Sequence, residues 1–137
     1  MNTQKNHYAM VDYILRNKKT PKTDNEICEF ALTSVEISAN IPRTNFTQIT
    51  QKHEDVNCRY VSMYLMRKYS KTPLKKIGTY YTGRGNKPKD HATVLNGIKV
   101  VDNHIYSRDK LKIKDGGDSF MDRLLVESES RVMEFVK

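Results

Sequence analysis

The sequence predicts an all-α protein, folded as a helical bundle, and two observations lead to this fold class. Apolar residues recur at the three- and four-residue spacing of amphipathic helices along most of the chain. No segment shows the clean alternation of polar and apolar residues that marks a half-buried strand. The 137 residues, 37% apolar and 29% charged, are enough for one domain with a real core.

Two helices are expected before residue 40. The first covers roughly residues 7–16, where apolar residues have helical spacing, and a polar linker broken by Pro21 follows it. Thr23 and Glu26 then form a capping-box pattern directly before an apolar run. This pattern predicts a second helix over about 24–36.

The middle of the chain is predicted to hold a long helix and a short one. Either a short helix or a turn fits residues 44–50. The strongest helical pattern begins near Val56. Thr72 suits an N-cap and Pro73 the first helical position, which predicts a short helix over about 73–81.

The last two helices are separated by a charged linker. Asp90 suits the N-cap of a helix over about 90–105, and apolar residues from Met121 onward mark a final amphipathic helix with an acidic outer face. We therefore expect three parts: an N-terminal helix and linker (1–23), a central helix-turn-helix domain (24–106), and a linker with a C-terminal helix (107–137).

The chain carries few signs of special chemistry or targeting. Cys28 and Cys58 lack the paired spacing of a disulfide framework or a zinc site, and Met63 and Met66 are expected to fill the core. His7, His53 and His104 are isolated and expected at the surface. No apolar run approaches the roughly 18 residues of a membrane span, and the first residues do not resemble a signal peptide. We predict a cytoplasmic protein with no metal, no cofactor and no membrane contact.

Positive charge is concentrated in one segment. The formal net charge is +8, yet residues 56–89 alone contain nine Lys and Arg residues and no Asp or Glu. Charge of one sign gathered in this way is typical of a site for a polyanion. Nucleic acid is therefore the expected partner, rather than an acidic protein or solvent alone.

The stretch TGRGNKPKDHATV, residues 82–94, allows three interpretations. A phosphate-binding loop is disfavoured because the stretch lacks the GK[ST] ending and follows a helix rather than a strand. A catalytic site is disfavoured because Asp90 and His91 are adjacent and cannot orient each other across a helix face. No catalytic residue and no enzyme activity are predicted. The third interpretation is a helix-turn-helix in which the second helix enters the major groove.

In that third interpretation the first turn of the helix would read bases. Asp90 can accept a hydrogen bond from cytosine, His91 can donate one to guanine, and Thr93 can meet a thymine methyl group. The alternative is that Asp90 only caps the helix and His91 only faces solvent. Spacing alone does not decide between the two.

The segment from Arg59 to Ile105 closely resembles the C-terminal DNA-binding domain of the bacterial replication initiator DnaA, a member of the TrpR-like helix-turn-helix superfamily. The family pattern runs Arg-x-x-Ala-Met-Tyr-Leu, then Leu-x-x-Ile-Gly, then Gly-Gly-Arg-Asp-His-(Thr/Ser)-Thr-Val. The matching residues here are Arg59, Met63, Tyr64, Leu65, Leu74, Ile77, Gly78, Gly83, Arg84, Asp90, His91, Thr93, Val94 and Leu95.

The resemblance implies binding to double-stranded DNA. Asp90, His91 and Thr93 would contact bases, and Ala92, which replaces a Thr or Ser of the family, could still meet a thymine methyl group. Our own argument from charge and placement adds a set of contacts to the DNA backbone. The members of this set are Lys52, Lys68, Lys71, Lys75, Lys76, Arg84, Lys87 and Lys89.

Three departures from the family pattern stand out. The family also sends an Arg from the loop before the long helix into the minor groove, and only Lys52 or His53 could replace it here, beside Glu54 and Asp55. The segment GNKPK, residues 85–89, lengthens the basic turn. The ATPase module of the initiator has no counterpart in these 137 residues, so we expect a stand-alone module whose target sequence cannot be copied from the family.

Sequence-specific binding of double-stranded DNA is the function we expect. Control of replication, control of transcription and a role in a phage or mobile element are alternatives for the process it serves. The competing hypothesis is a protein–protein adaptor that keeps the fold without reading bases and docks a partner through its acidic C-terminal helix. The oligomeric state is left open.

Overall fold

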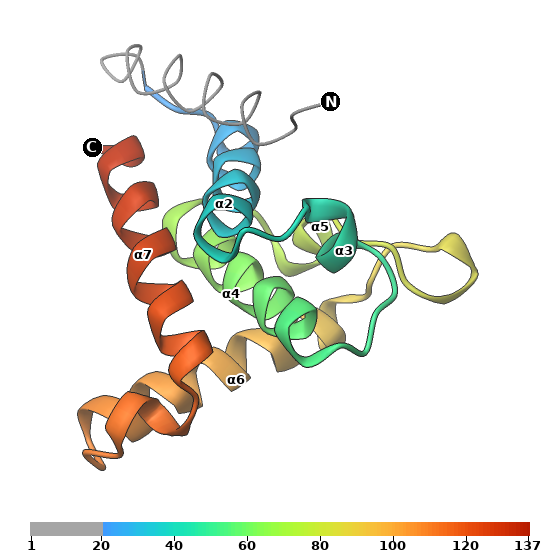
Figure 1. Ribbon diagram of the computed structural model, residues 1–137. Helices are drawn as coiled ribbons and strands as arrows, with labels where there is room; N and C mark the ends of the chain where they lie inside the picture. Colours follow the sequence, from blue (N-terminus) through green and yellow to red (C-terminus); the bar gives the residue numbers. More distant parts are fainter. Residues whose placement is uncertain (1–20) are drawn as a thin grey trace.

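The computed structural model describes residues 21–137, and within that range it is a bundle of α-helices without a strand (Figure 1). The expected helix over 7–16 lies outside the described residues. The all-α prediction is confirmed for the rest. The helices, in order, are α2 (Asp24–Ala39), α3 (Arg43–Thr47), α4 (His53–Tyr69), α5 (Leu74–Gly78), α6 (His91–Asp109) and α7 (Ser119–Val136).

Helix α4 is the centre of the bundle. It packs against α2 on one side and against α6 and α7 on others, so that every residue from Val61 to Met66 is buried. Met63 and Met66 are fully buried, which confirms their expected place in the core. Since a helix buried on several faces exchanges most of its surface for apolar contacts, α4 is the element on which the others are assembled.

Helix α2 begins as the sequence predicts. The Thr23 side chain accepts a hydrogen bond from the backbone N–H of Glu26 (3.1 Å), and the Glu26 carboxylate accepts one from the Thr23 N–H (3.1 Å). The helix continues to Ala39, three residues beyond the expected end, and stops at Asn40, whose backbone is left-handed (φ 55°). Asn tolerates this conformation better than most residues.

Helix α7 belongs to the same core as the central domain. Its apolar side contacts α2 and α4, and the Phe135 ring stacks on Phe30 of α2 with ring centroids 4.2 Å apart. The Arg131 guanidinium also donates a hydrogen bond to Ser38 of α2. The C-terminal segment is therefore packed into the bundle rather than attached by its linker alone.

The start of the short helix was predicted wrongly. Helix α5 covers only Leu74–Gly78, with Pro73 at the cap position and no capping side chain. Thr72, the expected N-cap, is buried instead, and its hydroxyl hydrogen-bonds with the Ser70 hydroxyl (2.7 Å) and the Cys28 thiol (3.3 Å). Burial beside these groups takes the hydroxyl away from the helix end.

Three further expectations are corrected or sharpened by the described residues. Helix α4 begins at His53 rather than near Val56, and a short helix, not a turn, occupies Arg43–Thr47. His104 is buried, with 6% of its surface exposed, and its ring Nε2 lies 3.1 Å from the Asp122 carboxylate. A surface position for His104 is therefore wrong.

No helix in residues 21–137 has the length and apolar character needed to cross a membrane.

Candidate nucleic-acid interface

The first turn of α6 is closed by Asp90. The Asp90 carboxylate accepts a hydrogen bond from the backbone N–H of Thr93 (2.8 Å), which confirms the predicted N-cap. This hydrogen bond is the largest cause of the lowered pKa of Asp90. The carboxylate is therefore charged at neutral pH and fixed at the tip of the helix.

The residues that follow Asp90 present their side chains to solvent. His91 and Ala92 are exposed and Thr93 is half-buried. Neither ring nitrogen of His91 makes a hydrogen bond to any residue of the described chain. The turn thus carries an acceptor, an imidazole, a methyl group and a hydroxyl, which are the groups that base edges can recognise.

Helix α5 holds the start of α6 in place. The backbone N–H of Lys89 donates to the Gly78 carbonyl at the end of α5 (3.1 Å). One turn into α6, Val94 is fully buried in the same core cluster as Ile77 of α5. The first turn of α6 is therefore positioned by the packing of two helices and not by a free loop.

The lengthened turn between α5 and α6 forms a small hairpin. Thr82 and Pro88 make an isolated antiparallel bridge, and a tight 3-10 turn over Arg84–Asn86 forms the tip. Figure 1 shows this hairpin projecting from the bundle beside the start of α6, on the side opposite α7. The segment GNKPK, residues 85–89, is therefore part of an ordered projecting hairpin, or arm, rather than an irregular loop.

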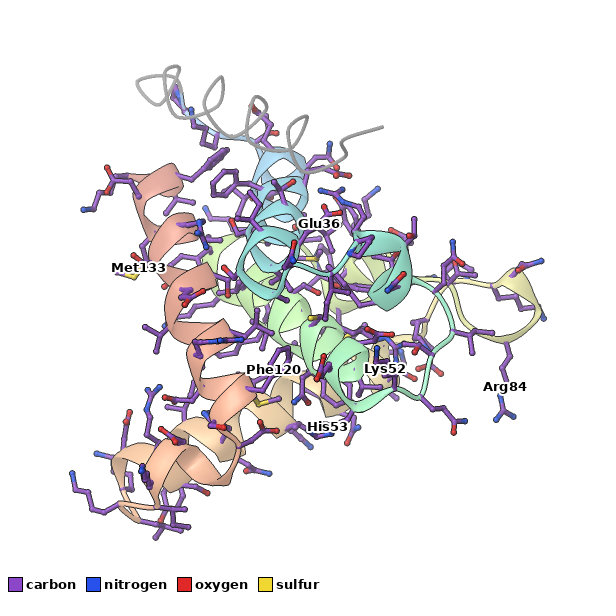
Figure 2. All side chains as sticks on the ribbon, viewed as in Figure 1. Glu36, Lys52, His53, Arg84, Phe120 and Met133 are labelled. Atoms are coloured by element: carbon purple, nitrogen blue, oxygen red, sulfur yellow. The ribbon has the colours of Figure 1, made fainter. Side chains whose placement is uncertain are left out.

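Most of the predicted phosphate-binding cations are exposed. Lys52, at the cap of α4, is exposed, and Figure 2 shows Arg84 pointing away from the bundle at the edge of the molecule. Lys89 is half-buried, and burial, followed by repulsion from Arg59, lowers its pKa. The exposed members of the set are Lys52, Lys68, Lys71, Lys75, Lys76, Arg84 and Lys87.

Lys68 differs from the others in its partners. Its ammonium donates to the Glu129 carboxylate of α7 (2.7 Å) and lies over the rings of Tyr64 and Tyr69. Partial burial is the largest single influence and opposes its charge, but Glu129 and Tyr64 together outweigh it, and the pKa of Lys68 is raised. The ammonium is held toward α7, and we leave it out of the proposed DNA contacts.

Arg59, unlike Lys68, is buried and does not reach the surface. Only 6% of it is exposed, and its guanidinium donates to the backbone carbonyls of Phe46 (3.2 Å) and Gln48 (3.0 Å). A longer contact joins it to the Thr50 carbonyl (3.4 Å). Arg59 therefore organises the segment between α3 and α4, and the surface charge is smaller than the sequence count.

Three exposed residues of α6 were not singled out for base contact by the sequence analysis. Leu95, Asn96 and Lys99 follow Ala92 at intervals of three, four and seven residues, which places them along the same side of the helix. Asn is the side chain that pairs most often with adenine. Helical spacing from Ala92 was the signal available for finding them.

Comparison with known proteins assigns most of this segment to one family. A family described as "Bacterial dnaA protein helix-turn-helix" matches residues 31–101. The chromosomal replication initiator protein DnaA of Synechococcus sp. (strain JA-2-3B'a(2-13)) is 30% identical over 112 residues, which are 81% of this chain and 22% of that protein. The DnaA of Spiroplasma citri is 30% identical over 95 residues, 69% of this chain and 18% of its own.

The chain thus spans about a fifth of the length of the curated relatives that it matches. No solved structure gives a match of comparable significance.

Proposed function

Since the chain belongs to the family of bacterial DnaA helix-turn-helix domains, a membership that implies DNA binding, we propose that it binds a specific sequence of double-stranded DNA. The N-terminal turn of α6 enters the major groove. The observation that carries this proposal is the exposed turn of Asp90, His91, Ala92 and Thr93, held rigidly against α5 and bordered by cations.

Each side chain of the turn has a distinct role in the proposed contact. The His91 ring is free to donate to a guanine acceptor, and the Ala92 methyl group can pack on a thymine methyl. The Asp90 carboxylate, already engaged by the Thr93 N–H, can accept from a cytosine amino group. Asn96 and Lys99, further along α6, extend the same side of the helix toward the base edges and the backbone.

The cations around this turn are proposed to meet phosphates. Lys75 and Lys76 lie on α5, next to the start of α6, while Lys87 lies on the hairpin. Phosphate contacts orient a protein on the duplex and supply most of its non-specific affinity. Their loss should therefore weaken binding to every sequence.

Selection of bound duplexes from a random pool tests the proposal, followed by affinity measurements on the enriched duplex and on a scrambled one. His91→Ala should weaken binding to the enriched duplex by roughly 5- to 150-fold, the loss expected for one good base contact, and leave the scrambled duplex nearly unchanged. Asp102→Ala, an exposed change further along α6, serves as the matched control.

Equal losses on both duplexes would remove His91 from the base-reading residues. If no sequence is enriched and binding has no salt dependence, the protein–protein adaptor becomes the better hypothesis.

A further inference from the structure

The hairpin between α5 and α6 is a defined structure, not a slack connection. Besides the bridge between Thr82 and Pro88, the Gly83 N–H donates to the Lys87 carbonyl in a short hydrogen bond (2.6 Å). Gly85 (φ 67°) and Asn86 (φ 57°) are both left-handed, which reverses the chain within the tip. The backbone of the tip is therefore held in one conformation.

Both ends of the hairpin are fixed to the bundle. On the incoming side, the Thr82 N–H donates to the Thr47 carbonyl of α3 (2.7 Å), and the buried Tyr81 hydroxyl lies 2.6 Å from that of Ser62 in α4. On the outgoing side, Lys89 is hydrogen-bonded to Gly78 and leads directly into α6. Such anchoring makes the arm a fixed extension of the reading helix.

The tip of this arm is narrow and carries a single free guanidinium. Arg84 stands between Gly83 and Gly85, which have no side chains, and within residues 21–137 its guanidinium has no hydrogen-bond or ion-pair partner. A Cβ atom added at Gly85 would meet nothing within 4 Å, so open space surrounds the tip. Figure 2 shows the Arg84 side chain directed away from the bundle.

The place of the arm next to α6 decides which part of a duplex it can reach. When the first turn of α6 lies in the major groove, the residue before it, Lys89, lies at the edge of that groove, where the sugar–phosphate backbone runs. From Thr82 in the bridge to Arg84 in the tip the chain advances by two residue steps, which extend the arm by roughly 7 Å beyond this edge. The next feature of the duplex is the minor groove, about 6 Å wide, which admits a narrow segment but not a helix.

We propose that the hairpin of residues 82–88 is a second DNA-reading element that places the Arg84 guanidinium in the minor groove beside the site of α6. This inference rests on the proposed function and deepens it. A·T-rich minor grooves are narrow, with a more negative potential that attracts Arg, and they lack the guanine 2-amino group that blocks the floor of the groove. The arm therefore makes the protein prefer A·T pairs flanking its central sequence.

Flank substitution in the selected duplex tests this inference. The central sequence is kept, and the flanking pairs are made A·T, G·C or inosine·cytosine. Inosine·cytosine presents the major groove of G·C but, without the 2-amino group, a minor groove like that of A·T. The wild-type chain should bind the A·T and inosine·cytosine flanks about fivefold or more tightly than the G·C flank, as expected for loss of one base contact.

Arg84→Ala should abolish this preference while keeping the preference for the central sequence. Lys87→Ala, on the other side of the same tip, is the matched control: it should weaken binding to all three duplexes by the same factor and keep their order. Both residues are exposed and their side chains make no hydrogen bond within the described chain, so unfolding temperatures should match the wild type.

The inference is overturned by a wild-type chain that does not distinguish the flanks, or by inosine·cytosine behaving like G·C. It is also overturned if Arg84→Ala weakens all three duplexes equally, which is the result for a phosphate contact. The failure of the proposed function looks different, because in that case no central sequence is enriched at all, and the inference falls with it.

Discussion

A Cβ atom on Gly78 would lie 2.0 Å from the backbone carbonyl oxygen of Lys89, closer than real Cβ contacts ever come. The two residues are also joined by the hydrogen bond from the Lys89 N–H to the Gly78 carbonyl (3.1 Å). The end of α5 and the approach to α6 therefore meet backbone to backbone. Glycine at this position therefore determines how closely the first turn of α6 can approach α5.

Gly78→Ala should separate these two segments. Alanine is the better helix former, so any loss of stability reports the clash and not the helix propensity. We expect the free energy of unfolding to fall by about 2 kcal/mol, with a further loss of specific DNA binding as the first turn of α6 moves. Chemical denaturation and affinity for the enriched duplex measure the two effects.

Gly83→Ala is the matched control for that change. A Cβ atom there would lie 3.3 Å from the Lys87 carbonyl oxygen, a much milder contact than the one at Gly78. A small shift of the hairpin can absorb this contact. Equal stability of the Gly78→Ala chain and the wild type would show that α5 and the start of α6 are not held by this approach.

Lys75 is the cation best suited to report phosphate binding. It is exposed on α5. Its neighbours Lys71 and Lys76 lie close to an acidic residue: Asp24 accepts a hydrogen bond from the Lys71 N–H (3.1 Å) and lines the same surface depression as Lys76. The wild-type chain should show a log–log salt slope of roughly −4 to −5, as for four to six neutralised phosphates.

Lys75→Ala should make that slope shallower by about one and weaken binding to specific and random duplexes alike. Titrations at several salt concentrations measure it. Asp102→Ala should leave the slope unchanged apart from a general charge effect. An unaltered slope in the Lys75→Ala chain would place this lysine outside the footprint.

Arg59→Met should destabilise the fold while leaving the exposed charge of the surface intact. The change removes the donors to three backbone carbonyls, at Phe46, Gln48 and Thr50. Hydrogen bonds from charged groups contribute about 1.5–3 kcal/mol each, and we expect a loss of about 3 kcal/mol in all. Thermal unfolding checks this, and hydrogen exchange should show faster opening of residues 46–52.

Arg67→Met is a control for Arg59, because the Arg67 side chain is exposed and makes one long contact, 3.5 Å, to the Thr72 carbonyl. Its unfolding temperature should stay close to the wild type. Similar losses in both variants would mean that charge alone, and not the three carbonyl contacts, explains the effect.

The stability of the junction between α6 and α7 should depend on acid pH. Partial burial opposes the charged form of Asp122, but hydrogen bonds from His104 (3.1 Å) and Arg108 (2.9 Å) hold its pKa below the ordinary value of 3.8. The folded state therefore releases this proton more readily than the unfolded state. The stabilisation is fully present above about 3.8 and is lost as the pH falls through the lower folded pKa.

Asp122→Asn should accordingly be less stable than the wild type at neutral pH, and the difference should shrink as the pH falls below 3.8. Denaturation curves at a series of pH values measure it. Asp102→Asn, an exposed change on α6, should run parallel to the wild type throughout. A difference between Asp122→Asn and wild type that is constant with pH would contradict the assignment.

Local patterns in the sequence predicted the helix starts that depend on local chemistry. The capping pair at Thr23 and Glu26 and the cap at Asp90 form as expected, since each joins groups only three residues apart. The cap predicted at Thr72 was wrong because the Thr72 hydroxyl hydrogen-bonds with the thiol of Cys28, 44 residues away in sequence. Spacing along the chain carries no information about such a partner.

The positions of charged side chains were harder to predict from the sequence than the positions of helices. Nine cations between residues 56 and 89 predicted one basic surface, but Arg59 turns inward to backbone carbonyls and Lys68 pairs with Glu129 of α7. The same limit explains His104, which looks isolated in the sequence and lies against Asp122 in the fold. Each of these partners is supplied by tertiary packing.

Helix α7 and the hairpin project from opposite sides of the bundle, and Figure 1 shows the chain ending at the far end of α7. A fluorophore, a solid-support linker or a fused effector joined at Lys137 would therefore stand clear of a duplex held at the start of α6. With dyes on Lys137 and on one end of the DNA, energy transfer would report the direction in which the protein sits on an asymmetric site.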